Sequence, residues 1–203
     1  MNSNKKKKIT NEIIETINDN DISKQELHKI KLEPMGDDDI RTYYPNSRIL
    51  TYPQLKTYNS IEELLPNDKS HVFLLYLSQP NSGHWTLVSR NNNVIEFFCS
   101  YGSSPSAPLK WLNSDERNRL GESIPYLDLL LNKTKIKVIY NPIDYQDKIN
   151  LKISTCGRYD CFRLMTILKY NLTLAQFYQL MKTVKDKTGL TYDEIVSDYI
   201  NKL

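Results

Sequence analysis

The sequence predicts an α+β fold with a central, mostly antiparallel sheet flanked by helices. Short runs rich in β-branched and aromatic residues gather in the middle of the chain and are typical of strands. Segments with helical spacing or helix-start signals lie before and after them. No internal repeat and no long linker divides the chain. Its 203 residues suffice for one well-cored domain, which we place at residues 9–203.

The N-terminal third is predicted to be helical and then irregular. Residues 1–8 are polar and lysine-rich, and we expect them to form a flexible basic N-terminus. Isoleucines at helical spacing over residues 9–17 predict a short amphipathic helix. Prolines and a glycine punctuate residues 32–55, which favours a loop with short helical turns. Ser60 followed by Glu63 has the spacing of a capping box, so a short helix is expected to begin there.

Strands dominate the middle of the chain and helices the end. The predicted strands are residues 71–77, 84–90, 94–99 and 135–141. Three asparagines at 91–93 suit a tight hairpin turn, because Asn tolerates a positive φ. Residues 100–108 are expected to form a turn-rich loop, and residues 111–132 a mixed helical stretch. After Cys156 the chain is predicted to be helical, with Thr191 and Glu194 as a capping box for the last helix.

Composition excludes several classes of protein. Hydrophobic residues at 39% and charged residues at 25% describe an ordinary soluble globular protein. A net charge of +3 is too weak by itself to indicate nucleic-acid binding. No apolar run has the length of a membrane span, and no apolar segment follows the first lysines, so we expect an intracellular, reduced protein. Lys5, Lys6, Lys7 and Lys8 could contact nucleic acid or act as a targeting signal, although a solvated tail is the favoured interpretation.

The chain has three cysteines, Cys99, Cys156 and Cys161. Cys156 could be a buried packing residue, half of a disulfide, a metal ligand or a nucleophile. A reducing compartment disfavours disulfides. A zinc site is poorly supported, because the chain has three histidines and no Cys-x-x-Cys pair. We therefore predict no metal and no cofactor. Cys156 remains either a buried packing residue or a nucleophile.

Cys156 has the setting that a nucleophilic cysteine needs. The thiolate attacks, and a helix N-terminus or a neighbouring imidazolium favours its formation. Cys156 directly precedes a predicted helix, and Gly157 allows close backbone approach there. Cys161 lies inside that helix and is expected to be core. The partner of Cys156 must be a histidine, and His84 at a strand start is favoured over the other two, although such a histidine alone is more often structural.

The order of four motifs resembles a known family. GHW, then FFxSYG, then YNxxxYQ, then TCGRY is similar to the adenain-like and SUMO-protease-like cysteine peptidases, especially the capsid-maturation proteases of virophages and large DNA viruses. GHW alone is a weak signal, whereas four motifs in this order are specific. The resemblance runs over most of the chain and implies a papain-like fold of the adenain and SUMO-protease type, with the nucleophile at a helix N-terminus.

The resemblance also implies roles for individual residues. His84 would be the general base and Cys156 the residue that forms the acyl-enzyme. Gln146 matches the family glutamine whose side-chain amide helps to form the oxyanion hole, although the segment that follows it is longer than in the family. Trp85 would wall a narrow substrate channel, with Gly157 as a second substrate-binding residue.

At one position the sequence departs from the family. Relatives carry Asp or Glu where this chain has Cys99, and that acid orients the histidine and stabilises its cation. Glu96 is near in sequence, but three residues earlier on a strand it should point to the opposite face unless the strand is bulged. Cys99, Glu96 or no residue at all could therefore serve as the third catalytic member.

The function that we predict is a cysteine endopeptidase that matures viral capsid proteins at Gly-containing sites. Its partner would be a co-encoded capsid protein, and its location the host cytoplasm or nucleus, or the virion. One alternative is a deconjugating protease for ubiquitin-like modifiers. Another is a catalytically impaired binding module with the same fold, for which Cys99 is the main support.

Overall fold

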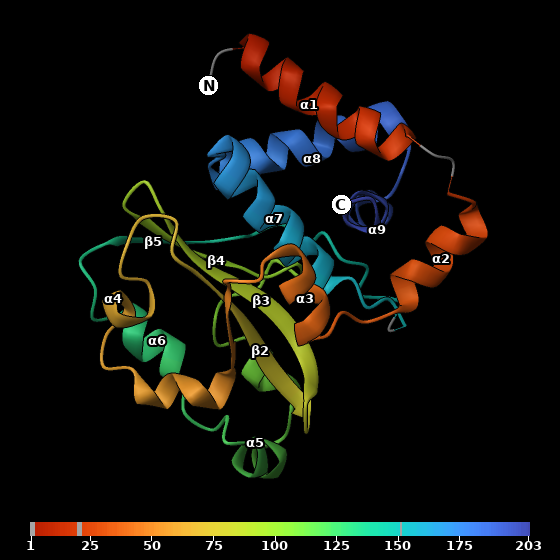
Figure 1. Ribbon diagram of the computed structural model, residues 1–203. Coiled ribbons are helices and arrows are strands. Elements are labelled where there is room, and N and C mark those ends of the chain that lie inside the picture. The colour runs from red at the N-terminus through yellow and green to blue at the C-terminus, as the bar shows by residue number, and fades with distance from the viewer. Residues whose placement is uncertain (1–2, 20–21, 151) are drawn as a thin grey trace. The chain divides into compact units, whose positions relative to one another are not determined.

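The computed structural model describes residues 3–19, 22–150 and 152–203 (Figure 1). The chain forms two compact units. Residues 1–43 and 145–203 form the first, which we call the helical unit, and residues 44–144 form the second, which we call the sheet unit. Helices and a sheet together confirm the predicted α+β class. The prediction of a single domain over residues 9–203 stays a prediction.

The helical unit is built from helices at the two ends of the chain. They are α1 (Ser3–Asn18), α2 (Lys24–Leu32), α3 (Asp37–Tyr43), α7 (Cys156–Tyr170), α8 (Leu174–Thr188) and α9 (Tyr192–Asn201). Figure 1 shows α1, from the N-terminal end, alongside α8 from the C-terminal end, and the two helices are in contact. Helix α9 contacts α1, α2, α7 and α8. The helices that follow Cys156 confirm the prediction for this part of the sequence.

Helix α1 begins earlier than the sequence predicted. It starts at Ser3 rather than at Ile9, so the predicted helix start is wrong, and Met1 and Asn2 lie outside the described residues. The flexibility expected of residues 1–8 stays a prediction. Ile9, Ile13 and Ile17 are buried and anchor one face of the helix. Lysine is a good helix former, so the polar N-terminal residues continue the helix that this apolar face stabilises.

The sheet unit contains a five-stranded sheet in the order β1-β2-β3-β4-β5. The strands are β1 (Arg48–Thr51), β2 (His71–Gln79), β3 (Ser82–Asn91), β4 (Val94–Phe98) and β5 (Lys137–Tyr140). The inner pairs β2–β3 and β3–β4 are antiparallel, whereas β1 and β5 join the two edges in parallel. Parallel neighbours need long connections, and the long segments between β1 and β2 and between β4 and β5 provide them. Asn92 and Asn93 both have positive φ, which confirms the predicted hairpin turn.

The sequence did not predict strand β1. The expectation of a loop with short helical turns over residues 32–55 is wrong for β1, whereas the short helix α3 agrees with it. Strand β1 has only four residues and lies between Pro45 and Pro53, so its local pattern is too short to indicate a strand. Hydrogen bonding to β2, a long-range interaction, stabilises it instead.

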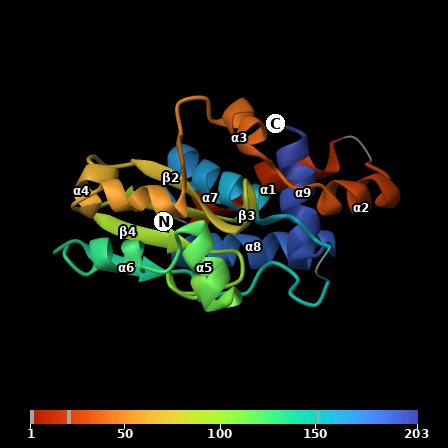
Figure 2. The same cartoon turned by 90° about the horizontal axis from the view of Figure 1, so that it is seen from below.

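Short helices cover one face of this sheet (Figures 1 and 2). They are η1 (Tyr52–Thr57), α4 (Ile61–Leu64) and α6 (Tyr126–Leu131), and their apolar side chains form one core with the strands. The Ser60 hydroxyl accepts a hydrogen bond from the backbone N–H of Glu63, as the predicted helix start requires. Helices η2 (Pro108–Trp111) and α5 (Ser114–Leu120) lie in the connection between β4 and β5.

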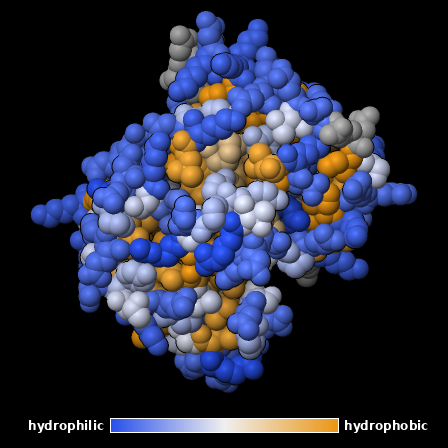
Figure 3. Space-filling view, in the orientation of Figure 1, coloured by the Kyte–Doolittle hydropathy of each residue, from blue (hydrophilic) through white to orange (hydrophobic). Residues whose placement is uncertain are grey.

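One face of the molecule is largely polar (Figure 3). Figure 3 shows a face on which hydrophilic residues predominate and apolar residues form separate patches. In the part of the chain that the structure describes, no helix has both the length and the apolar character needed to cross a bilayer.

Candidate functional site

His84 lies on β3, on the face of the sheet that the short helices cover. It is paired with Tyr76 of β2, and Tyr76 belongs to the core under those helices. Directly opposed residues of neighbouring strands share a face, which places the His84 side chain on that side. A Cβ atom on the preceding Gly83 would lie 1.8 Å from the carbonyl oxygen of Tyr76. The glycine of the GHW motif therefore lets β3 approach β2 directly beside His84.

Cys99 is in contact with His84. The Nε2 atom of His84 lies 3.3 Å from the Sγ atom of Cys99, which immediately follows β4. The carbonyl oxygen of Cys99 accepts a hydrogen bond of 2.7 Å from the Nδ2 atom of Asn141, just beyond β5. The structure thus brings two of the predicted residues together, and Asn141 fixes the backbone that carries the thiol.

Glu96 lies on the opposite face of β4. The pairing of β3 with β4 is regular along the whole of β4, so no bulge changes the direction of its side chains. Ile95 and Phe97, which flank Glu96, belong to the same apolar core as Cys99. Because side chains alternate along a strand, the expected orientation of Glu96 is confirmed. Of the two candidates for the third position, Cys99 is the residue that shares a face with His84.

Two aromatic rings border the imidazole of His84. Tyr101 stacks on it with 4.8 Å between ring centroids, and Trp111 meets it edge-on at 5.1 Å. His84 is only 8% exposed, whereas Trp111 is 51% exposed. Burial lowers the pKa of His84 to about 3, so the imidazole is neutral at pH 7.

Trp85 follows His84 and therefore points to the other face of β3. It is paired with Leu75 and is buried. The substrate-binding role that the family resemblance implies for Trp85 stays a prediction. The exposed indole in contact with His84 belongs to Trp111, which no local pattern in the sequence indicated.

Cys156 is the first residue of α7 and is partly exposed. Its predicted position at a helix N-terminus is therefore confirmed. The preceding Thr155 makes no side-chain capping hydrogen bond, and the first turn contains no acidic residue. The amides and dipole at such a helix end favour a negative charge, a setting that stabilises a thiolate. Gly157 is buried in the same turn, and its substrate-binding role stays a prediction.

The Arg158 guanidinium lies at the same end of α7. Its Nη1 atom donates hydrogen bonds to the carbonyl oxygens of Glu33, at 2.6 Å, and of Ser154, at 3.5 Å. Burial lowers the pKa of Arg158, while negative charge on neighbouring groups, among them the Cys156 thiolate, raises it. A permanent cation therefore interacts with the candidate nucleophile within one unit.

Gln146 is buried in the loop that connects β5 to α7. Its Nε2 atom donates a hydrogen bond of 3.1 Å to the carbonyl oxygen of Ile153, across this loop. The loop protrudes in the middle, where Ile149 is 94% exposed. The middle of the loop is thus exposed to solvent, while Gln146 is buried at its base. Its role as an oxyanion donor stays a prediction.

Cys161 lies inside α7 and is fully buried, which confirms its predicted place in the core. Burial raises the pKa of its thiol well above the usual value, so the thiol stays protonated. Asp160, beside it in sequence, is also fully buried, and burial likewise raises the pKa of its carboxyl group. Neither residue has the exposure that a nucleophile needs.

The predicted residues fall into two groups. His84, Cys99 and Trp85 belong to the sheet unit, and Gln146, Cys156 and Gly157 belong to the helical unit. Within the first group His84 contacts Cys99, and within the second Gln146 and Cys156 flank one loop. Over residues 3–19, 22–150 and 152–203, no group of three or more His, Cys, Asp or Glu side chains could hold a metal ion.

The fold and these two groups define an α+β protein with a partly exposed thiol at a helix N-terminus and a buried histidine–thiol pair. The chain is 37% identical over 155 residues to the uncharacterized protein V9 of Sputnik virophage. The alignment covers 74% of this chain and 84% of that protein. The chain therefore belongs to the family of this virophage protein. No family model matches the chain.

Two solved structures are similar in part. A selenomethionine crystal structure of the ASFV pS273R protease has a TM-score of 0.47 and 15% identity, and the match covers 83% of this chain and 67% of that chain. Another crystal structure of the same protease has a TM-score of 0.36 and 20% identity. That match covers 66% of this chain and 42% of that chain.

Proposed function

We propose that this chain is a cysteine endopeptidase in which Cys156 is the nucleophile and His84 the general base. The observation that carries the proposal is the position of Cys156, a partly exposed thiol at the N-terminus of a 15-residue helix. Thr155 leaves the helix without a side-chain cap, and Arg158 adds a positive charge. These features favour the thiolate that a nucleophilic attack requires.

The proposed reaction follows the chemistry of thiol peptidases. The proton of the Cys156 thiol passes to His84, and the sulfur attacks the carbonyl carbon of the scissile peptide. Negative charge develops on the carbonyl oxygen, to which the side-chain amide of Gln146 would donate a hydrogen bond. The C–N bond then breaks as His84 returns the proton to the leaving amine. Water hydrolyses the remaining thioester, with His84 passing the proton of that water to the departing sulfur.

The proposed substrate is a viral capsid protein that is cleaved at Gly-containing sites. The virophage origin of the V9 relative supports a viral setting. The rings of Tyr101 and Trp111 beside His84 support a narrow site, because a glycine lets a substrate backbone approach aromatic rings closely.

Incubation with the co-encoded capsid protein tests this function. We expect wild-type protein to release fragments with new termini next to glycine, identified by mass spectrometry. The Cys156→Ala variant should release none, because it lacks the sulfur that forms the acyl-enzyme. Identical fragments from both proteins, or an uncut capsid protein, would refute the proposal.

A catalytically impaired binding module is the second candidate, and one observation favours it. His84 contacts a thiol in place of a carboxylate, and its lowered pKa makes it a weak base. This alternative predicts that the capsid protein binds to the wild-type chain and to Cys156→Ala equally well and stays intact. A pull-down that compares the two proteins, followed by mass analysis, separates the two functions.

A further inference from the structure

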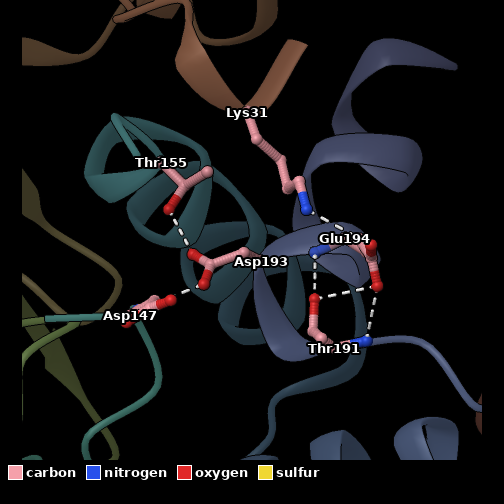
Figure 4. Close-up of polar contacts among 6 residues, drawn as sticks. All are labelled: Lys31, Asp147, Thr155, Thr191, Asp193 and Glu194. Atoms are coloured by element: carbon pink, nitrogen blue, oxygen red, sulfur yellow. Dashed lines mark hydrogen bonds and ion pairs between the residues drawn. The ribbon is translucent and has the colours of Figure 1, made fainter. Parts of the chain in front are cut away.

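The carboxylate of Asp193 joins two segments that meet at the base of one loop (Figure 4). Asp193 lies in the first turn of α9 and is buried. Its Oδ1 atom accepts a hydrogen bond from the Thr155 hydroxyl at 2.5 Å, and its Oδ2 atom accepts one from the backbone N–H of Asp147 at 3.1 Å. Burial raises the pKa of Asp193, while the hydrogen bonds from Thr155 and Asp147 lower it.

The two residues that Asp193 holds are neighbours of the candidate catalytic groups. Asp147 directly follows Gln146, and Thr155 directly precedes Cys156. Local contacts such as the 2.8 Å hydrogen bond from the backbone N–H of Ile149 to Asp147 order the start of the loop between them. Near its end, the backbone N–H of Ser154 donates a hydrogen bond of 2.8 Å to the carbonyl oxygen of Lys31. Because one buried carboxylate binds both ends of the loop, the base of the loop is fixed although its middle is exposed.

Asp193 is not needed to cap its own helix. Thr191 and Glu194 form the capping box of α9, and Glu194 also pairs with Lys31 at 3.2 Å (Figure 4). In turn, Thr155 uses its hydroxyl on Asp193 and makes no side-chain cap for α7. One contact therefore anchors the loop and leaves the amides at the start of α7 without a side-chain acceptor from Thr155.

We propose that Asp193 is a positioning residue that sets the spacing between Gln146 and Cys156. This inference rests on the proposed peptidase function, since it assigns the oxyanion donor and the nucleophile to the two ends of the loop. Asp193 does not touch the substrate. It acts through Asp147 on one side and through Thr155 on the other.

The test compares Asp193→Asn with wild type at equal concentrations of active enzyme, determined by titration of the reactive Cys156 thiol. An amide can accept one of the two hydrogen bonds but turns an NH₂ group toward the other donor, so the base of the loop should loosen. We expect kcat to fall by about tenfold or more with KM within about twofold, because small misplacements of catalytic groups mainly slow the chemical step. Trypsin should also cut faster after the exposed Lys148 and Lys152.

Thr155 and Asp198 provide matched controls. Thr155→Val should show the same loss in kcat as Asp193→Asn. Thr155→Ser should keep the wild-type kcat, because serine retains the hydroxyl group. The double variant Asp193→Asn/Thr155→Val should be little worse than the more impaired single variant, as expected when both changes break one contact. Asp198→Asn removes another buried carboxylate of α9, which pairs with Lys202 at 2.7 Å, and should lower stability without changing kcat.

The outcomes distinguish the positioning role of Asp193 from the peptidase function. Unchanged kcat and unchanged trypsin cleavage in Asp193→Asn, or equal changes in Asp198→Asn, would overturn the positioning role. If wild-type protein cleaves no substrate but trypsin cuts Asp193→Asn faster than wild type, the anchoring of the loop by Asp193 is supported and the peptidase function is refuted.

Discussion

The thiol of Cys99 occupies the place beside His84 where a carboxylate would carry a charge. A carboxylate would accept the Nε2 proton, hold the ring in one tautomer and stabilise its cation. A thiol can donate a hydrogen bond or accept one, so it selects neither tautomer. The thiol therefore does not offset the desolvation of His84, and burial lowers the pKa of the imidazole. The proposed catalysis therefore relies on the groups at the start of α7 for the thiolate.

Restoring the acid should strengthen the base. In Cys99→Asp the new carboxylate would raise the pKa of His84, and we expect kcat/KM at pH 7 to rise by about two- to tenfold. The acid limb of the pH profile, where His84 becomes protonated, should move to higher pH. Profiles of kcat/KM against pH for both proteins measure this.

Glu96→Gln is the control for this substitution. Glu96 lies on the other face of β4, so the variant should keep the wild-type profile. If Glu96→Gln abolishes activity and Cys99→Asp changes nothing, then Glu96 is the third member and Cys99 is not.

Arg158 should control the reactivity of Cys156. Wild-type protein is expected to react with iodoacetamide at Cys156 well before Cys99 and Cys161, which are both buried. Arg158→Gln removes a cation that interacts with the thiolate, so alkylation at pH 7 should slow by about 3- to 10-fold. The midpoint of the rate against pH should also move to higher pH. Peptide mapping after brief labelling at several pH values gives both quantities.

Lys169→Gln is the matched control, because it removes a cation from the far end of the same helix. Lys169 pairs with Glu12 at the surface and should not influence Cys156. Equal alkylation rates in Arg158→Gln and wild type would show that the helix N-terminus alone activates the thiol.

At the scale of elements, the β2–β3 hairpin depends on the close approach at Gly83. Gly83→Ala would place a methyl group 1.8 Å from a backbone oxygen, so the strands must separate beside His84. We expect a loss of about 2–4 kcal/mol in the free energy of unfolding, measured by urea denaturation. Gly36→Ala is the control, since its nearest neighbour is 3.7 Å away. Similar unfolding midpoints for the two variants would contradict this account.

The elements that the sequence predicted are those with a local signature. Asn92 and Asn93 indicated a hairpin, and Thr191 with Glu194 indicated the start of α9, because each acts on backbone within a few residues. Strand β1 has no such signature, since pairing with a distant strand creates it.

The candidate site divides in the same way. The four motifs indicated Cys156 and His84, and the alternation of β4 gave the direction of Glu96. Trp111 could not be predicted, because its contact with His84 arises from the path of the β4–β5 connection. Asp193 could not be predicted for a similar reason, because its hydrogen-bond partner Thr155 lies 38 residues before it in the sequence.

At the scale of the whole molecule, the buried groups His84 and Glu122 make opposite contributions to the dependence of stability on pH. The folded-state pKa of His84 is lowered to about 3, so its contribution is present above about pH 6.5 and is lost as pH falls toward 3. Burial raises the pKa of Glu122 to about 7, although the hydrogen bond from the backbone N–H of Leu77 lowers it. The contribution of Glu122 is therefore present below about pH 4.5 and is lost as pH rises through 7. Between these limits the two slopes oppose each other.

Glu122→Gln should remove one of the two slopes. The amide oxygen can still accept the Leu77 N–H, but it does not ionise, so the loss of stability that Glu122 causes as pH rises should be absent. Relative to Glu122→Gln, wild-type protein should lose about 1–3 kcal/mol between pH 5 and pH 8, after allowance for solvent screening. Urea unfolding of both proteins at these two pH values measures the difference, with Glu116→Gln in the capping box of α5 as the control. If wild type and Glu122→Gln change in parallel from pH 5 to pH 8, Glu122 is already ionised in the folded protein, and the hydrogen bond from Leu77 outweighs its burial.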